Sequence, residues 1–378
     1  MKCTINDIAN VISESIPNPS ESGYDIFVGL EHYDSGEVKI TRYGSTENLV
    51  TAVKVFQKGD ILLARRNVYL KRAGLVDFDG VTSGDSIVLR VKKDLTSLGV
   101  SSSAIQKYLP FVLNTEEFWN YAEKYSDGTM SKRLSPKTLL QYEFEIPEDV
   151  DNKNELLWAA FEAKESYRAM IRATDEMVKS QFIEQFSGDS IPRHELSSLC
   201  SEFLDGDWIE SKDQSDAGYR LVQTGNVGVG EYIDKSGRAR FVSEETFKRL
   251  NCTEIFSGDI LFSRLPEPLG RCCIIPEDFP KAITAVDCTI ARLNEKCLPE
   301  FLVVYTSTSM YSCQVEKCVT GTTRQRISRN NLAKISVPCP SKEKQIAFVK
   351  IVRQADKSKF ELKQAIEKID KVMRALMQ

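Results

Sequence analysis

Two long stretches of the chain have the apolar spacing of long helices. Residues 152–186 and 342–378 contain no proline or glycine and are rich in helix-forming residues. In both, apolar side chains recur about every three and a half positions, the period of a coiled-coil seam. The predicted seam consists of Leu156, Ala160, Ala163, Tyr167, Met170 and Met177 in the first helix, and of Val352, Ala355, Leu362, Ile366, Ile369, Met373 and Leu376 in the second. We expect an antiparallel coiled coil, although packing of each helix onto its own globule stays open.

The remaining segments have the pattern of mixed globular domains. Short runs rich in β-branched and aromatic residues, such as "AVKVFQKGDILLAR" and "SIVLRV", alternate with polar segments and with short helices such as 115–124. The predicted fold class is therefore α+β, with two globular domains separated by two long helices. The predicted boundaries are 1–147 for the first domain, 148–188 for the central helix, 189–340 for the second domain and 341–378 for the C-terminal helix.

The two globular segments repeat each other's motifs in the same order. "GDILLAR" at Gly59 returns as "GDILFSR" at Gly258, and "GTMSKRLSPKTL" at Gly128 returns as "GTTRQRISRNNL" at Gly321. The offsets of 199 and 193 residues are far longer than the period of a solenoid repeat. The chain is therefore predicted to contain two copies of one domain in a pseudo-twofold arrangement.

Composition and charge limit the classes of function. The 378 residues are 42% apolar and 28% charged, which is ordinary for a globular protein. The formal net charge of −4 means that any contact with DNA must come from a local basic patch or a basic partner. The start of the chain lacks a basic region followed by an apolar run, so we expect a soluble, cytoplasmic protein without a membrane segment.

Residues for catalysis or metal binding are not evident in the sequence. Ten cysteines include no Cys-x-x-Cys pair, and the two histidines, His32 and His194, occupy different places in the two copies. We find no Gly-rich phosphate loop, no dinucleotide-binding fingerprint, no amino-methyltransferase tetrapeptide and no nucleophile elbow. We therefore expect no catalytic residue, no metal and no cofactor, with both histidines incidental and the cysteines as reduced structural thiols.

Basic residues follow the repeated motifs at matching places. The Gly-Asp pair itself suits a tight turn before a buried strand and needs no further function. The cations that follow are candidates for contact with phosphates or base edges. The candidates are Arg65, Arg66, Lys132 and Arg133 in the first copy, and Arg264, Arg324, Arg326 and Arg329 in the second. The alternative is that these segments are solvated loops.

Together these motifs resemble the specificity subunit of type I restriction-modification systems. The resemblance rests on "GDILFSR", "GTTRQRISRNNL", the "VPCPSKEKQIAFV" passage from Val337, and the duplicated order of globule and helix. The first copy departs from the pattern, because Pro136 stands where the second copy has Arg329. Its strand-ending proline motif is also reduced to Pro147, whereas the second copy has Pro338 and Pro340.

The resemblance implies a DNA-binding subunit without catalytic activity of its own. Each globule would be a target recognition domain that binds one half of an asymmetric, bipartite double-stranded DNA sequence. The helices would fix the spacer and dock two methyltransferase subunits, while ATP-dependent translocation and cleavage would belong to restriction subunits. Candidates for base recognition, chosen by residue type, are Gln223, Asn226, Arg238 and Arg240.

Two other classes of function remain as alternatives. One is a standalone two-domain DNA-binding or scaffold protein with a coiled-coil interface, and a neighbouring methyltransferase gene would distinguish it from a specificity subunit. The other is an enzyme with an unrecognised site, for instance a nuclease with scattered carboxylates. Paired acidic residues do not recur at matching positions in the two copies, which disfavours the enzyme.

Overall fold

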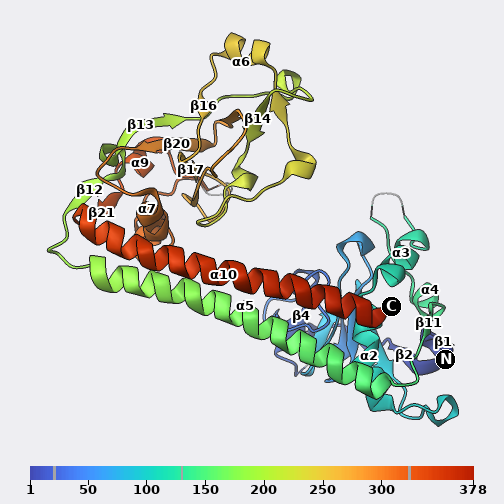
Figure 1. The fold of residues 1–378 in the computed structure, drawn as a ribbon. Coiled ribbons are helices and arrows are strands. Elements are labelled where there is room, and N and C mark those ends of the chain that lie inside the picture. The colour runs from blue at the N-terminus through green and yellow to red at the C-terminus, as the bar shows by residue number, and fades with distance from the viewer. Residues whose placement is uncertain (20–22, 129–130, 322–324) are drawn as a thin grey trace. The chain divides into compact units, whose positions relative to one another are not determined.

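The computed structural model describes residues 1–19, 23–128, 131–321 and 325–378 (Figure 1). The chain divides into two compact units. Unit 1 comprises Met1–Ser166 and Ala365–Gln378, and unit 2 comprises Tyr167–Gln364. Both units combine β-sheets with helices, so the predicted α+β class with two long helices is confirmed. Within the described residues, no helix has the length and apolar character needed to span a bilayer.

The described residues of unit 1 form three sheets and four short α-helices, besides the segments of the two long helices. The four-stranded sheet has the order β2 (Ala9–Ile12), β10 (Ser86–Val91), β7 (Ile61–Ala64), β8 (Ala73–Leu75). The five-stranded sheet has the order β3 (Ser15–Ile16), β6 (Val53–Phe56), β9 (Gly80–Ser83), β4 (Ile26–Val28), β5 (Gly44–Ser45). Strand β1 (Lys2–Thr4) pairs with β11 (Glu143–Glu145). The helices are α1 (Ile5–Ile8), α2 (Ser102–Val112), α3 (Glu116–Lys124) and α4 (Pro136–Leu140).

Unit 2 has a similar sheet plan, but its second sheet has four strands instead of five, without a counterpart of β3. One sheet has the order β13 (Cys200–Asp205), β20 (Cys288–Leu293), β17 (Ile260–Ser263), β18 (Cys272–Ile274). The other has the order β15 (Phe241–Val242), β14 (Tyr219–Val222), β19 (Ala282–Thr284), β16 (Glu254–Ile255). Strand β12 (Arg193–Glu195) pairs with β21 (Ser336–Pro338). The helices are α6 (Glu244–Leu250), α7 (Pro299–Thr306), α8 (Ser309–Lys317) and α9 (Arg329–Ala333).

The repeat seen in the sequence extends to strand pairing. In each unit, the second sheet contains one parallel pair, β4 with β9 and β14 with β19, flanked by antiparallel neighbours. The same side-chain bond marks both parallel pairs: Thr82 donates to the carbonyl of Val28 at 2.7 Å, and Thr284 donates to that of Val222 at 3.0 Å. Val28 and Val222 are therefore equivalent positions, which aligns the loops that follow them.

The repeated Gly-Asp pair has a structural role in both units. Gly59 and Gly258 have φ angles of 90° and 88°, where a side chain would be strained. The next residue is buried in each case. Asp60 accepts a bond from Arg90 on β10 at 2.7 Å, and Asp259 pairs with Arg292 on β20 at 3.1 Å. The motif therefore ties the start of one central strand to its neighbour.

Two long helices, α5 (Val150–Phe186) and α10 (Lys342–Met377), each contribute a segment to both units. In unit 2 their segments run antiparallel. Phe182 and Phe348 pack edge to face at 5.4 Å between ring centroids, while Lys359, further along α10, lies 2.7 Å from Asp175, which precedes Phe182 on α5. In unit 1, Lys164 of α5 lies 3.1 Å from Asp370 of α10.

The predicted seam on α5 is wrong in its register. Leu156, Met170 and Met177 are 49%, 53% and 45% exposed. The residues one position later on α5 are enclosed instead, since the side chains of Leu157 and Val178 are buried. The sequence pattern did not reveal the true contact face of α5, because this face includes the charged residues Lys164 and Asp175. The apolar stripe that was predicted as the seam lies on the adjacent face.

The other predicted seam residues vary in burial. On α10, Val352 and Ala355 are buried, and the later members are partly buried: Leu362, Ile366, Ile369, Met373 and Leu376. On α5, Ala160, Ala163 and Tyr167 are also only partly buried. The side chains of α10 are therefore sequestered most fully at its N-terminal end, within the core of unit 2.

Candidate nucleic-acid interface

In unit 1, basic side chains gather where strand β7 ends. Arg65 and Arg66 follow the strand directly, and the loop before α4 returns to them. The N–H of Leu134 donates to the carbonyl of Arg65 at 2.9 Å, and Arg66 and Arg133 form a β-bridge. Ser135 then caps α4 by accepting from the N–H of Thr138 at 3.0 Å. These backbone bonds fix the place of the loop's cations.

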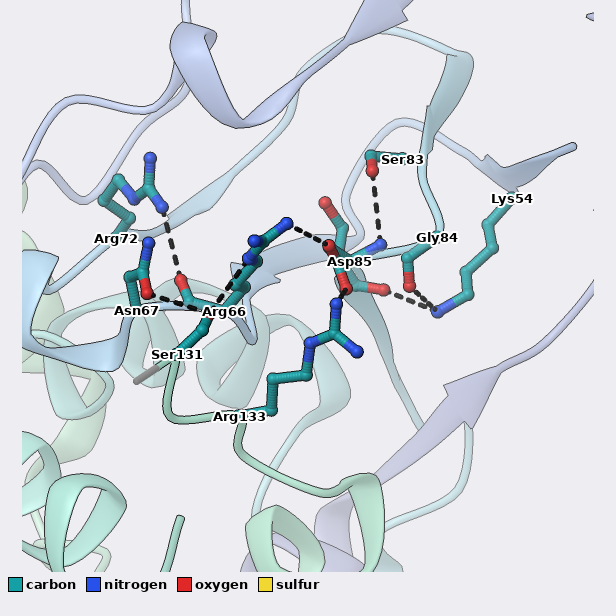
Figure 2. Close-up of polar contacts among 10 residues, drawn as sticks. Lys54, Arg66, Asn67, Arg72, Ser83, Gly84, Asp85, Ser131 and Arg133 are labelled. Carbon is teal, nitrogen blue, oxygen red and sulfur yellow. Dashed lines mark hydrogen bonds and ion pairs between the residues drawn. The ribbon is translucent and has the colours of Figure 1, made fainter. Parts of the chain in front are cut away.

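The side chain of Asp85 lies among these cations (Figure 2). It is 3.7 Å from the Arg66 guanidinium and 3.5 Å from that of Arg133. Lys54 lies close by, and its ammonium donates to the carbonyl of Ser86 at 2.6 Å. Burial lowers the pKa of Lys54, and the charge of Arg65 lowers it further. The carboxylate of Asp85 opposes both effects.

We call Lys54, Arg65, Arg66, Arg133 and Asp85 the Asp85 cluster. It contains four cations and one carboxylate, and thus three net positive charges. Arg66 and Arg133 are 45% and 49% exposed, so their guanidinium groups can reach a ligand. Exposed guanidinium groups held by a carboxylate and by backbone bonds are suited to charge-assisted bonds with phosphate oxygens or to bidentate bonds with base edges.

Unit 2 repeats this arrangement around Asp287. The N–H of Arg264 donates to the carbonyl of Asp287 at 2.9 Å, as that of Arg65 does to Asp85 at the same distance. Arg326, the equivalent of Arg133, lies 3.8 Å from the Asp287 carboxylate and is 50% exposed. The sequence repeat therefore corresponds to a repeated ion pair between a basic loop and the turn before a central strand.

In unit 2, a further acidic side chain lies beside the arginines of the basic loop. Asp205 lies 3.6 Å from Arg264 and 3.7 Å from Arg329. The side chain of Arg264 is only 8% exposed and donates to the carbonyl of Val286. The guanidinium group of Arg264 is thus enclosed by the protein in the free chain, and its predicted contact with DNA stays a prediction. Arg329 remains 40% exposed.

The remaining candidate residues lie in different parts of the two units. Asn226 is 8% exposed, and both its amide oxygen and its amide nitrogen form hydrogen bonds within its own turn; its role in base recognition stays a prediction. Gln223, Arg238 and Arg240 line one cavity of about 200 Å³. Lys132 donates to the carbonyl of Glu123 at 3.3 Å. Arg324 lies outside the described residues.

Two side chains of these sites, those of Lys54 and His32, were not predicted from the sequence. Lys54 comes from the other sheet of unit 1, so no local motif announced it. His32, interpreted as incidental, accepts a bond from the N–H of Gly29 at 2.9 Å. Asn226 makes the equivalent bond to the N–H of Gln223 at 3.0 Å. The repeat of this turn could have been found by aligning the chain on Val28 and Val222.

The described residues offer little for metal or thiol chemistry. Among them, no three His, Cys, Asp or Glu side chains are placed to hold a metal ion. The ten cysteines are free thiols, and most are buried. Burial raises the pKa of Cys272 to about 12 and that of Cys297 to about 12, so these thiols are protonated at neutral pH.

Comparison with known proteins points to one family. Residues 201–371 match the model described as "Type I restriction modification DNA specificity domain". No curated protein matches the chain in sequence. A solved structure described as "Structural basis underlying complex assembly and conformational transition of the type I R-M system" is 16% identical, with a TM-score of 0.54 over 100% of this chain and 96% of that chain. This similarity shows a shared fold.

Two further solved structures are similar along their length. The S subunit of the type I restriction-modification system from M. genitalium is 15% identical, with a TM-score of 0.49 over 100% of this chain and 96% of that one. The HsdS subunit from Thermoanaerobacter tengcongensis is 16% identical, with a TM-score of 0.40 over 100% and 95%.

Proposed function

The chain carries a type I restriction-modification DNA specificity domain, and we propose that it acts as a specificity subunit whose two units each bind one half of a bipartite DNA target. The observation that supports two binding units is the repeated ion pair, Arg133 with Asp85 and Arg326 with Asp287. In both units this pair fixes an exposed arginine at the end of a central strand.

The two halves of the proposed target differ in sequence. The units share a strand plan, but the side chains around their basic loops are unlike. Lys54 joins the Asp85 cluster in unit 1, whereas Asp205 neutralises Arg264 and Arg329 in unit 2. Since base recognition depends on the side chains and not on the scaffold, unlike surfaces select unlike base pairs. The target is therefore asymmetric.

The chemistry of modification and cleavage is assigned to partners. The chain itself is a non-catalytic subunit, bound in the cytoplasm to two methyltransferase subunits and to ATP-dependent restriction subunits. In this proposal, residues 1–147 and 189–340 are the recognition domains. The helical segments 148–188 and 341–378 fix the spacer and dock the methyltransferases. The exposed apolar side chains of α5, Leu156, Met170 and Met177, are available for such docking.

The proposed DNA contact is tested by removing the exposed arginines of one unit. Arg66→Ala with Arg133→Ala should weaken binding of the full chain to duplex DNA and reduce the slope of log affinity against log salt by about one for each lost phosphate contact. Lys93→Ala is the matched control, because Lys93 is an exposed cation outside the cluster. Equal effects in the control and the double variant would contradict the assignment.

The standalone DNA-binding alternative is distinguished by partner binding. A specificity subunit should co-purify with the methyltransferase encoded beside it, and the modified adenines should then appear at one sequence in the host genome. A chain that binds DNA but retains no methyltransferase at micromolar concentration would favour the standalone protein.

A further inference from the structure

Unit 2 contains a basic cavity that is separate from its basic loop. The cavity of about 200 Å³ lies between the end of β14 and the segment before β15. Four cations line it: Arg220, Lys235, Arg238 and Arg240. Gln223 and Thr224 add polar groups to the same wall. A concave surface with this concentration of positive charge is suited to an anionic ligand.

Three of the four cations lack an acidic partner. Among the described residues, Lys235, Arg238 and Arg240 form no ion pair, and their segment is exposed. Only Arg220 is neutralised, by Asp234 at 2.5 Å. Three unpaired cations around one cavity repel each other, so their proximity costs free energy until an anion enters.

Contacts within unit 2 hold the walls of the cavity in place. The Arg220 side chain is 13% exposed, and its guanidinium lies 5.7 Å and 5.5 Å from the ring centres of Tyr232 and Phe279. Gly225 leaves room for the Lys235 ammonium, which would lie 2.8 Å from a Cβ at that position. The absence of a side chain at Gly225 thus keeps this ammonium at the cavity wall.

In unit 1, cations at the matching turn are paired with acids. Alignment on Val28 and Val222 places Glu31 opposite Gly225, so a carboxylate stands where unit 2 has no side chain. Arg42 lies three residues before Ser45, which pairs with Ile26 of β4, and it forms a bidentate pair with Asp34 at 3.0 Å and 2.7 Å. Arg238 occupies this place in unit 2 and is unpaired.

The lysine at this turn of unit 1 is also paired with an acid. Lys39 of unit 1, which precedes Arg42 as Lys235 precedes Arg238, lies 2.7 Å from the carboxylate of Asp77. Two of the four cavity cations, Lys235 and Arg238, thus have counterparts in unit 1, Lys39 and Arg42, and both counterparts are paired with an acid. At the matching turn of unit 1, the ion pairs of Lys39 and Arg42 leave neither cation unpaired.

We propose that the cavity of unit 2 binds one backbone phosphate of the DNA half-site next to it, through Lys235, Arg238 and Arg240. This inference rests on the proposed DNA-binding function and adds an asymmetry to it. Unit 2 holds its half-site by a phosphate anchor that unit 1 lacks. The salt dependence of binding should therefore include one phosphate contact from this turn of unit 2 and none from the matching turn of unit 1.

The first test measures the salt dependence of binding by the full chain to its target duplex. Arg238→Gln with Arg240→Gln should reduce the slope of log affinity against log salt by about one, the loss of one phosphate contact. Gly225→Glu should have the same effect without removing a cation, because it introduces the carboxylate that unit 1 has. Arg42→Gln, the matched control in unit 1, should leave the slope unchanged.

The second test identifies the phosphate. Single uncharged methylphosphonate linkages are placed in turn along the target duplex. Binding by the unaltered chain should weaken at one phosphate in the half-site of unit 2, and the Arg238→Gln, Arg240→Gln chain should be insensitive to that replacement. Inorganic phosphate at millimolar concentration serves as the probe for a free anion.

The outcomes separate this inference from the function on which it rests. If no chain binds duplex DNA, the proposed function fails. If DNA binds with an unchanged slope in both cavity variants, the proposed function stands and the phosphate anchor is rejected. If millimolar inorganic phosphate raises the melting temperature of the unaltered chain only, and the slope is unchanged, the cavity holds a free anion instead.

Discussion

At the residue scale, the repeated Gly-Asp pair shows what a local motif can and cannot predict. The turn was predicted correctly, because Gly59 adopts the positive φ that glycine favours. The partner of the aspartate was not predicted, since Arg90 lies thirty residues away on another strand. Short-range sequence patterns specify turns and strands, but pairing between distant strands emerges only from the fold.

The Asp60 to Arg90 pair should contribute measurably to stability. Asp60→Ala leaves a partly buried guanidinium group and the N–H of Gln57 without their acceptor. We expect a loss of about 2–4 kcal/mol in the free energy of unfolding, somewhat below the cost of breaking a fully buried pair. Urea denaturation measures it. Asp34→Ala, which breaks an exposed pair with Arg42, should cost less than about 1 kcal/mol, and equal costs would contradict this role.

Thiol reactivity provides a second test at this scale. Burial raises the pKa of Cys272 to about 12, while Cys313 is exposed. Because the thiolate is the reactive form, Cys313 should react with a maleimide within minutes at pH 7.5, and Cys272 should react only when unit 2 unfolds. Mass spectrometry of tryptic peptides gives both rates. Rapid labelling of Cys272 in the folded chain would show that this part of the core opens readily.

At the element scale, the two long helices were predicted from composition, but the contact face of α5 was not. The absence of proline and glycine is a strong signal of helix extent, and α5 and α10 occupy most of the predicted segments. The seam was shifted by one residue because Lys164 and Asp175 interrupt its apolar pattern. A shift of one residue turns a helix by about 100° and exchanges exposed for buried positions.

The ion pairs of Lys164 should fix the packing of the helix segments in unit 1. Its side chain is 8% exposed and lies 3.3 Å from Glu37 and 3.1 Å from Asp370. Lys164→Met removes the cation and leaves two carboxylates close together, which should cost about 2–4 kcal/mol. Calorimetry of the full chain measures the loss.

Two further variants test the cause of that loss. Adding Glu37→Gln and Asp370→Asn to Lys164→Met should recover part of the stability, since no uncompensated charge then remains at the site. Lys179→Met, which removes a lysine paired only within its own helix, should change stability by less than about 0.5 kcal/mol. Failure of the triple variant to regain stability would indicate that the lysine acts through packing of its stem.

At the scale of the whole molecule, duplication was the most informative signal in the sequence. Two motif pairs in the same order predicted two copies of one domain, and the two units share their strand order and parallel pairs. The chemistry of the proposed DNA-binding surface was harder to predict from the sequence. Arg65 and Arg264 hold equivalent places after equivalent strands, yet Arg264 pairs with Asp205, while no acidic partner of Arg65 is found among the described residues.

The central claim is that two unlike units of one chain bind two halves of a DNA target. Selection of random duplexes by the full chain with its methyltransferase subunits, followed by sequencing, tests it most directly. The account predicts two short and different sequence blocks separated by a gap of fixed length, with Arg66→Ala and Arg133→Ala weakening selection of one block only. A single continuous block, or the loss of both blocks in that variant, would contradict it.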